Sequence, residues 1–290
     1  ANYELDGQTQ QANVIGDVII EMTRAGDVLR EWKLHDIIDP YRLGYNSRRE
    51  DFWANHYDGV IDGAVYDWTH GNAIIYEEDN SFVISIPYQD AVVKISMDTG
   101  ELVWILGNPD NWDAPWSDKL LTPVGDVEWS YKHHAISHTE NGTYLLFDNG
   151  GNAGYGSGNP SAPTGVNIVT RMNSRVLEIN PVTFGKVWEY SISGHGSFRF
   201  FSFNVSSAQR LPNGNTLICE GAPGRIFEVT PEKAIVWEYI NPYFGDAPSR
   251  GPANSVNGVF RAHRYGPSFS GLQGKELDPA RYDNVNQLYT

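Results

Sequence analysis

The chain has 290 residues, of which 40% are hydrophobic, enough to bury a sizeable core in one domain or two. Its formal net charge of −15 argues against a nucleic-acid partner, because phosphate binding needs a basic face. No apolar run approaches the roughly 20 residues of a membrane-spanning helix, so no membrane span is predicted. Nine Trp, sixteen Tyr and 29 Gly, with little helical periodicity, favour an all-β protein with many turns.

Three hairpins are predicted along the chain, and each begins with a polar residue followed by alanine. The alanines are Ala73, Ala135 and Ala208, and the polar residues before them are Asn72, His134 and Ser207. The second and third hairpins turn at Asn-Gly pairs (141–142 and 213–214), a strong turn signal because both residues tolerate positive φ. The chain therefore repeats one structural unit with polar variation at a fixed position.

The second hairpin, within 131–150, gathers the most chemistry. His133 and His134 open its first strand, and Asp148 and Asn149 end its partner strand. The two ends are neighbours in an antiparallel pair, so imidazoles and a side-chain amide are expected at one rim of a sheet.

A second signature follows each of the three hairpins and also occurs once before them: a β-run ending in a charged residue, a turn, and an aliphatic-Trp pair. Its four copies end at Trp32, Trp104, Trp188 and Trp237, which are predicted to pack in the core. A hairpin plus this strand pair makes a four-stranded antiparallel unit. We find three complete units (about 66–107, 124–190 and 200–240), a half unit before them, and a possible first strand at 259–264.

Units of this size indicate a β-propeller with four-stranded blades. The chain is predicted to form one propeller domain over residues 1–290 that covers about four to five blades. A closed ring would need more, so we expect the C-terminal part of a longer propeller, or an association with missing blades or another chain.

Four ordered motifs resemble the bacterial arylsulfate sulfotransferase family. They are DWTHGNAIIY (67–76), AVVKISMDTGELVWILG (91–107), HHA with LLFDNG (133–150), and SSAQRLPNGNTLICEG (206–221). The resemblance implies a six-bladed propeller in a periplasmic or extracellular location. It also implies transfer of a sulfuryl group from an aryl sulfate ester to a phenol through a transiently sulfated histidine, without a nucleotide cofactor.

The resemblance implies roles for individual residues. His70 matches a sulfuryl-binding histidine, His134 or its neighbour His133 matches a second site histidine, and His195 is the nearest candidate for the nucleophile. Asn152 stands where the family tends to have an arginine that holds sulfonate oxygens; Arg171, Arg261 or Arg264 could substitute. The predicted catalytic residues are thus His70, His134 and His195, and the predicted substrate-binding residues are His133, Asn72, Asn149, Asn152 and Arg261.

Other interpretations of these residues stay open. Each histidine could instead be a structural hydrogen-bonding or loop residue, and Asp67 and Asp148 could orient neighbouring groups. No metal site is predicted, because the one short pair, His134 and His138, would lie about 13 Å apart in a strand. A non-catalytic propeller that serves as an extracellular binding or structural module is the main alternative. A quinone-dependent dehydrogenase ranks last, because neither a cysteine pair nor a cofactor constellation is visible.

Overall fold

A computed structural model of the chain describes residues 2–5, 8–11, 13–42, 44, 53, 60–62, 65–126, 128–150, 173–192, 200–246, 255–276, 278 and 280. Strands dominate these residues, and the α-helix among them, α1, is a single turn at Leu34–Ile37. None of the helices in this part of the chain is long and apolar enough to cross a membrane.

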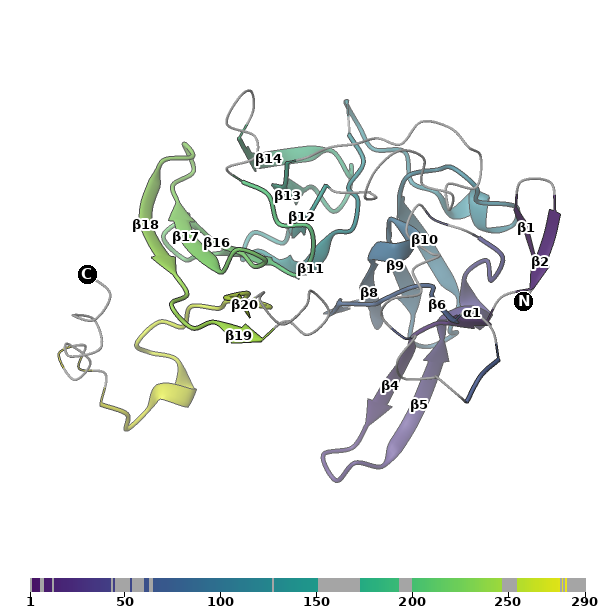
Figure 1. The fold of residues 1–290 in the computed structure, drawn as a ribbon, viewed down its shortest axis with the longest axis horizontal. Helices are drawn as coiled ribbons and strands as arrows, with labels where there is room; N and C mark the ends of the chain where they lie inside the picture. The colour runs from purple at the N-terminus through teal and green to yellow at the C-terminus, as the bar shows by residue number, and fades with distance from the viewer. Residues whose placement is uncertain are drawn as a thin grey trace.

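Three four-stranded antiparallel sheets follow one another along the chain (Figure 1). The first contains β7 (Ala73–Glu77), β8 (Ser81–Ile86), β9 (Ala91–Ser96) and β10 (Leu102–Gly107). The second contains β11 (His134–His138), β12 (Tyr144–Asp148), β13 (Arg175–Ile179) and β14 (Lys186–Ser191). The third contains β15 (Ser207–Arg210), β16 (Thr216–Glu220), β17 (Arg225–Val229) and β18 (Ile235–Ile240). The chain is an all-β protein built from propeller blades, as predicted.

The remaining strands form pairs. They are β1 (Asn2–Leu5) with β2 (Gln8–Gln11), β3 (Asn13–Ile15) with β6 (Val65–Asp67), β4 (Val18–Met22) with β5 (Val28–Lys33), and β19 (Gly245–Asp246) with β20 (Ser255–Val256). Short 3-10 turns lie at Pro87–Gln89, Trp116–Lys119 and Ser270–Leu272. The β4–β5 hairpin is the predicted half unit, and it projects away from the three sheets in Figure 1.

The predicted strand at 259–264 is wrong as secondary structure, because these residues join no ladder. They lie beside β15 instead, held by side chains and by the backbone hydrogen bonds Ser206 N–H to Phe260 O and Val259 N–H to Gly221 O. The Ser207 hydroxyl accepts the N–H of Ala262 at 3.2 Å, and the Gln209 side chain accepts the N–H of Arg264 at 2.8 Å. The segment 259–264 thus runs beside β15, and within the described residues it pairs with no strand.

The first strands of consecutive blades meet, because β11 contacts both β7 and β15. The loops that lead into these strands are therefore neighbours too. We call residues 67–73, 131–135 and 202–208 the inner rim, since they contain the ends at which these strands begin.

The register of the third and fourth strands explains the constant spacing of the Trp signature. Trp104, Trp188 and Trp237 lie directly opposite the charged residues Lys94, Glu178 and Glu228. A bulge interrupts each of these ladders beside the pair. The same bulge recurs in all three ladders, so it leaves the spacing constant. The copy in the third blade is one residue shorter because Val229 pairs with Ile235, whereas Ile179 pairs with Lys186.

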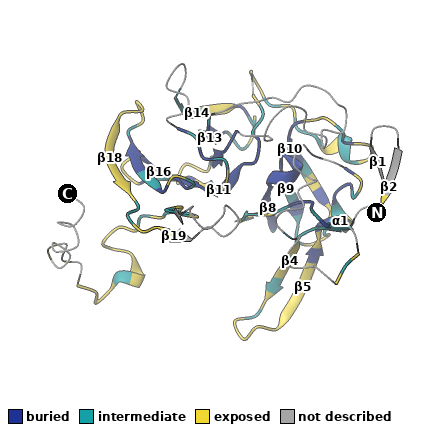
Figure 2. Cartoon of the chain, in the orientation of Figure 1, coloured by how far each residue is buried: buried dark blue, intermediate teal, exposed yellow. Residues whose placement is uncertain are grey.

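Three of the four signature tryptophans are buried or partly buried against the blades, as predicted. Trp237 is 43% exposed, so its prediction as a core residue is wrong. Residues 235–240 are all exposed, because no described blade lies against the outer face of β18 (Figure 2). The Arg264 guanidinium covers the indole instead, 4.8 Å from the ring centroid.

An aromatic cluster joins the second and third blades. Phe200 is fully buried at its centre, with edge-on ring contacts at centroid distances of 5.6 Å to Phe147, 5.2 Å to Tyr190 and 5.7 Å to Phe227. Aromatic pairs prefer this edge-to-face geometry. Since Phe200 lies just before the inner rim of the third blade, the same contacts fix where that rim begins.

We expect Phe200→Ala to lower the free energy of unfolding by about 3–5 kcal/mol, because it leaves a cavity between two blades. Urea denaturation followed by tryptophan fluorescence would measure the change. Phe244→Ala is the matched control, since its ring is exposed and its loss should change stability by less than about 0.5 kcal/mol. Equal losses in the two variants would contradict the central place of Phe200.

Candidate active site

Asn72, the polar residue before the first alanine of the repeat, links the first blade to the second. The Asn72 amide donates to the carbonyl oxygen of His133 at 2.9 Å, and its oxygen accepts the N–H of Ala135 at 3.2 Å. Asn72 therefore hydrogen-bonds to the backbone on both sides of His134. Its predicted substrate-binding role stays a prediction, and in this structure its amide positions a histidine.

His134 is almost fully buried, and its ring is held through Nδ1. That nitrogen lies 2.8 Å from the carbonyl oxygen of Lys132 and 2.8 Å from Oδ1 of Asn149. The Asn149 Nδ2 donates to the carbonyl oxygens of Ser202 and Val205, which fixes the amide so that its oxygen faces the imidazole. Two acceptors around Nδ1 require it to carry the proton. In the neutral ring, Nε2 then has the lone pair.

Burial lowers the pKa of His134 to about 4, and the nearby imidazoles of His70 and His133 act in the same direction. The hydrogen bonds to Asn149 and to the Lys132 carbonyl oppose this effect without overcoming it. The ring is consequently neutral at pH 7, with a fixed tautomer. A neutral imidazole with a fixed lone pair can act as a nucleophile or a base.

His133 has a different environment. It is fully buried, its Nε2 lies 3.0 Å from the carbonyl oxygen of Ala91, and its Nδ1 lies 3.2 Å from the Ser130 hydroxyl. Burial lowers the pKa of His133 as well. Both ring nitrogens thus contact protein groups between the first two blades. The geometry favours His134 as the site histidine of this pair and a structural role for His133.

His70 stands on the neighbouring loop and is supported from two sides. Its Nδ1 lies 2.5 Å from Oδ2 of Asp67, and its ring stacks on Tyr88 at a centroid distance of 4.5 Å. The side chain is 26% exposed, whereas that of Asp67 is buried. A buried carboxylate behind an imidazole fixes the tautomer and stabilises the imidazolium. Asp67 therefore orients His70, one of the roles that the sequence left open.

Left-handed backbone recurs at the same point of each blade. His70, Lys132 and Val205, each two residues before the polar residue of the repeat, have φ values of 53°, 52° and 50°. This conformation costs a residue with a side chain about 1 kcal/mol or more, and most for β-branched valine. This conformation occurs in all three blades. We therefore attribute it to the path by which each segment enters the inner rim.

Arg261 brings a fixed positive charge to this rim. Its Nη2 donates to the carbonyl oxygen of Asn72 at 2.9 Å, although 189 positions separate the two residues. Its Nε is buried and makes no hydrogen bond within the described residues. Arg261 precedes Ala262 as His134 precedes Ala135, so it extends the repeat to a fourth polar position. The interaction of Arg261 with a sulfonate group stays a prediction.

The other predicted site residues are only partly covered. Asn152 and His195, together with Arg171, lie outside the described residues. His263, which was not predicted as a site residue, is largely exposed, and its partial burial together with the charge of Arg261 lowers its pKa. The structure thus brings together Asn72, His134, Asn149 and Arg261, with His70 close by. The sequence prediction missed the stacking of Tyr88 on His70, which no motif indicates.

Comparisons with known proteins identify the family of the chain. The family model of the arylsulfotransferases (ASST) matches residues 1–241. The chain belongs to the arylsulfotransferase family. Arylsulfate sulfotransferase AssT of Escherichia coli O6:H1 (strain CFT073) is 26% identical over 267 residues, which cover 79% of this chain and 43% of the relative. The enzyme of the same name from Lelliottia amnigena is 28% identical over 176 residues, or 48% of this chain and 29% of the relative.

The chain therefore matches less than half the length of these curated arylsulfotransferases. Among solved structures, virginiamycin B lyase from Staphylococcus aureus has a TM-score of 0.36 at 12% identity, covering 61% of this chain and 45% of the lyase. BamB from Moraxella catarrhalis has a TM-score of 0.30 at 9% identity, covering 74% of this chain and 41% of BamB. Both are distant, and the blade topology described above adds more than they do.

The low pKa of His134 should appear as a loss of stability in acid. The unfolded state takes up a proton near pH 6.5 and the folded state only near pH 4, so stability is lost as pH falls between these values. The contribution is about 3 kcal/mol if His134 behaves as an independent site. Urea denaturation at pH 7 and pH 4.5 would measure it. The difference between the two pH values should shrink in His134→Gln; an unchanged difference would contradict the burial of a neutral ring.

The isosteric change Asn149→Asp should raise the pKa of His134. A carboxylate next to Nδ1 favours the imidazolium form, and such a contact typically moves a pKa by about 1–3. Imidazole signals in NMR spectra recorded against pH would show the change directly. Asn241→Asp is the control, because Asn241 donates to the backbone carbonyl of Asn257 and lies away from the rim. A His134 titration that stays as in the wild type would rule out the Asn149 contact.

Proposed function

We propose that this protein transfers a sulfuryl group from an aryl sulfate ester to a phenolic acceptor through a histidine of the inner rim, without a nucleotide cofactor. The observation that supports it most is the geometry of His134, whose Nδ1–H is held by two acceptors so that Nε2 offers a lone pair. Membership in the arylsulfotransferase family makes an aryl sulfate the substrate class to test first.

In the first half-reaction, an imidazole lone pair attacks the sulfur of the donor. The N–S bond forms while the bond from sulfur to the aryl oxygen breaks, and its electron pair leaves on the phenolate oxygen. His70, as an imidazolium supported by Asp67, gives this oxygen its proton. The products are a phenol and an N-sulfohistidine. In the second half, neutral His70 takes the proton of the acceptor phenol, whose oxygen attacks sulfur while the N–S pair returns to the ring.

The surroundings of His134 suit it as the sulfuryl carrier. A sulfated ring carries one positive and one negative charge, so the adduct is neutral overall and its burial costs less than that of an ion. The positive ring keeps Nδ1–H bonded to the oxygens of Asn149 and Lys132. Low basicity also makes the ring a good leaving group in the second half-reaction.

Charge on the sulfonate oxygens needs a counterpart. Arg261 is the described guanidinium at the rim, and guanidinium groups match anionic oxygens with paired donors. We propose that it serves in place of the arginine that Asn152 replaces. His195 is the carrier implied by the resemblance. If His195 is the histidine that becomes sulfated, His134 accepts the proton of the phenol instead.

The proposal also includes what the resemblance implies about the whole protein. Its substrates would be small aromatic sulfates and phenols, and its location periplasmic or extracellular, which fractionation of expressing cells would test. The single propeller domain over 1–290, as the C-terminal part of a longer propeller, stays a prediction.

A burst experiment tests the reaction. The purified protein, mixed with a chromogenic aryl sulfate, should release about one phenolate per site at once and turn over only when a phenol acceptor is added. His70→Gln should slow the burst, because the leaving phenolate loses its proton donor; losses of about 100-fold or more are typical of such groups. A wild-type protein that releases nothing from several donors would sink the proposal and favour the non-catalytic binding module.

Trapping with a sulfur-labelled donor separates the two carriers. The variant that cannot take up label, His134→Gln or His195→Gln, identifies the histidine that is sulfated. His138→Gln is the control, since this exposed histidine at the far end of β11 should leave labelling unchanged.

A further inference from the structure

The segment that delivers His134 is held by a buried carboxylate. Asp148 is fully buried at the end of β12, and its Oδ1 accepts the N–H of Tyr131 at 2.9 Å and that of Gly150 at 3.1 Å. Tyr131 immediately precedes the left-handed residue Lys132. A strained residue persists only where its surroundings fix it. Asp148 supplies one such restraint, and it is the direct neighbour of Asn149, which binds the His134 ring.

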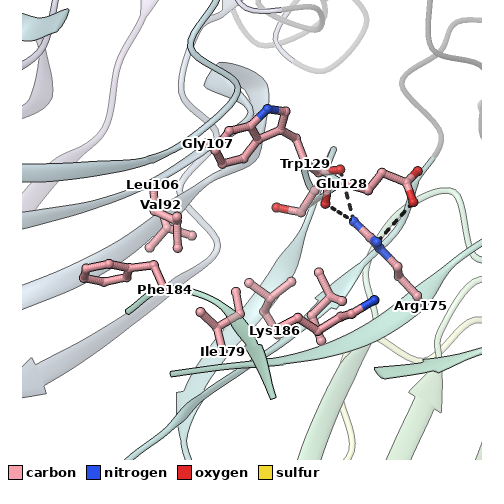
Figure 3. Close-up of a pocket in the computed structure, with 12 residues that line it drawn as sticks. Val92, Leu106, Gly107, Glu128, Trp129, Arg175, Ile179, Phe184 and Lys186 are labelled. Atoms are coloured by element: carbon pink, nitrogen blue, oxygen red, sulfur yellow. Dashed lines mark hydrogen bonds and ion pairs between the residues drawn. The ribbon is translucent and has the colours of Figure 1, made fainter. Parts of the chain in front are cut away.

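Arg175 completes this arrangement from the next strand. It lies opposite Asp148 in the β12–β13 ladder, is 3% exposed, and donates from Nε to Oδ2 of Asp148 at 2.8 Å. Its Nη1 lies 3.2 Å from the Glu128 carboxylate, and its Nη2 donates to the carbonyl oxygens of Glu128 and Trp129. Figure 3 shows the guanidinium reaching across one end of a pocket to these two residues. One side chain thus ties β12 to the segment at 128–131.

The third blade contains the same device. Glu220 lies opposite Arg225 in the β16–β17 ladder, with Oε2 and Nη1 3.3 Å apart, and its Oε1 accepts the N–H of Phe201 at 2.8 Å. Phe201 belongs to the segment that leads into β15, as Tyr131 belongs to the one that leads into β11. In the first blade, Ile86 and Ala91 occupy these positions, so no such ion pair forms there. The repetition indicates a function beyond the local strand pair.

We propose that Arg175 and Asp148 are positioning residues for the sulfuryl transfer, because they hold the 128–131 segment so that His134 presents Nε2 to the donor. The inference rests on the proposed function. It extends that function to two residues that touch no substrate and lie behind the inner rim. Arg175 acts through backbone carbonyls, which only a forked guanidinium can bind together with a carboxylate.

Other charged or titratable groups face His134 and must be kept unchanged in a test. His70 comes from the loop before β7, with Asp67 behind it, and His133 is adjacent in β11. Lys132 supplies the carbonyl that binds Nδ1. Arg175→Lys alters none of these groups and keeps the positive charge beside Asp148, while it removes the fork.

The experiment compares Arg175→Lys with Arg210→Lys. Arg210, at the end of β15 farthest from the inner rim, forms a largely buried ion pair with Glu178 of β13, away from residues 128–134. Burst amplitude would count the active sites, and the single-turnover rate per site would be recorded against pH. We expect Arg175→Lys to lower this rate about 10- to 100-fold with little change in KM, because misplacement of a reacting group costs rate. The acid limb should move to higher pH as water reaches His134.

The control fixes how the outcomes are interpreted. Arg210→Lys should keep the wild-type rate per site and pH profile even if it lowers stability. If Arg175→Lys lowers only the burst amplitude, with rate and profile unchanged, the pair is merely structural and the proposal fails. If Arg175→Lys does not fold, Glu128→Gln is the second variant, because it weakens one contact of the Arg175 guanidinium at an exposed side chain. We expect it to lower the rate about 2- to 5-fold, since the segment is then only partly misplaced.

An NMR measurement separates this inference from the proposed function. If wild type shows no burst, the sulfuryl transfer fails, but the His134 titration and tautomer can still be compared in wild type and Arg175→Lys. A His134 pKa that rises toward its ordinary value in Arg175→Lys supports positioning by Arg175 without any activity. An unchanged titration would overturn the inference, whatever the assay shows.

Discussion

The arrangement of the rim depends on hydrogen bonds from side chains of one blade to the backbone of the next. Asn72 binds the peptides on either side of His134, and Ser207 binds the peptide of Ala262. Inner strands of neighbouring blades form no common ladder, so their backbone groups need other partners. The polar residue of the repeat provides them. Where this residue is Asn72 or Ser207, its side chain joins two parts of the chain. Where it is His134 or Arg261, the imidazole or guanidinium lies at the same rim.

This arrangement makes the architecture and the chemistry inseparable at the inner rim. Asn149 binds the His134 ring through its oxygen, and through its nitrogen it binds the loop of the third blade. The same amide therefore sets both a tautomer and the distance between two blades. The buried, neutral imidazole follows from close packing of three loops. Arg261 adds charge from a segment that has no sheet of its own in the described residues.

The sequence was most informative where a pattern repeats. The Asn-Gly turn and the neighbouring Asp148-Asn149 predicted that imidazoles and a side-chain amide would share one rim, and the 2.8 Å contact of His134 with Asn149 confirms it. Trp237 was predicted wrongly, because its local pattern matches the other copies while its burial depends on a neighbouring blade. Likewise, the segment at 259–264 has the composition of a strand but lacks a partner strand.

Other features needed three-dimensional distances. The choice between His133 and His134 turns on which ring meets Ala91, a contact across 42 positions that no local pattern contains. The Arg175 pairing did leave a signal, since the third strands of the second and third blades both begin with arginine, at Arg175 and Arg225. That signal becomes interpretable only once Asp148 and Glu220 are seen opposite them.

At the left-handed residues before the inner strands, the demands of stability and of activity differ. Glycine adopts this backbone without strain, so it would be the easier residue at Lys132 or Val205. It would also give the chain more freedom just before His134 or Ser207. An evolutionary path that rewards thermal robustness alone would favour glycine there, whereas one that rewards a fixed imidazole would keep side chains. The rim thus marks where these two selective pressures diverge.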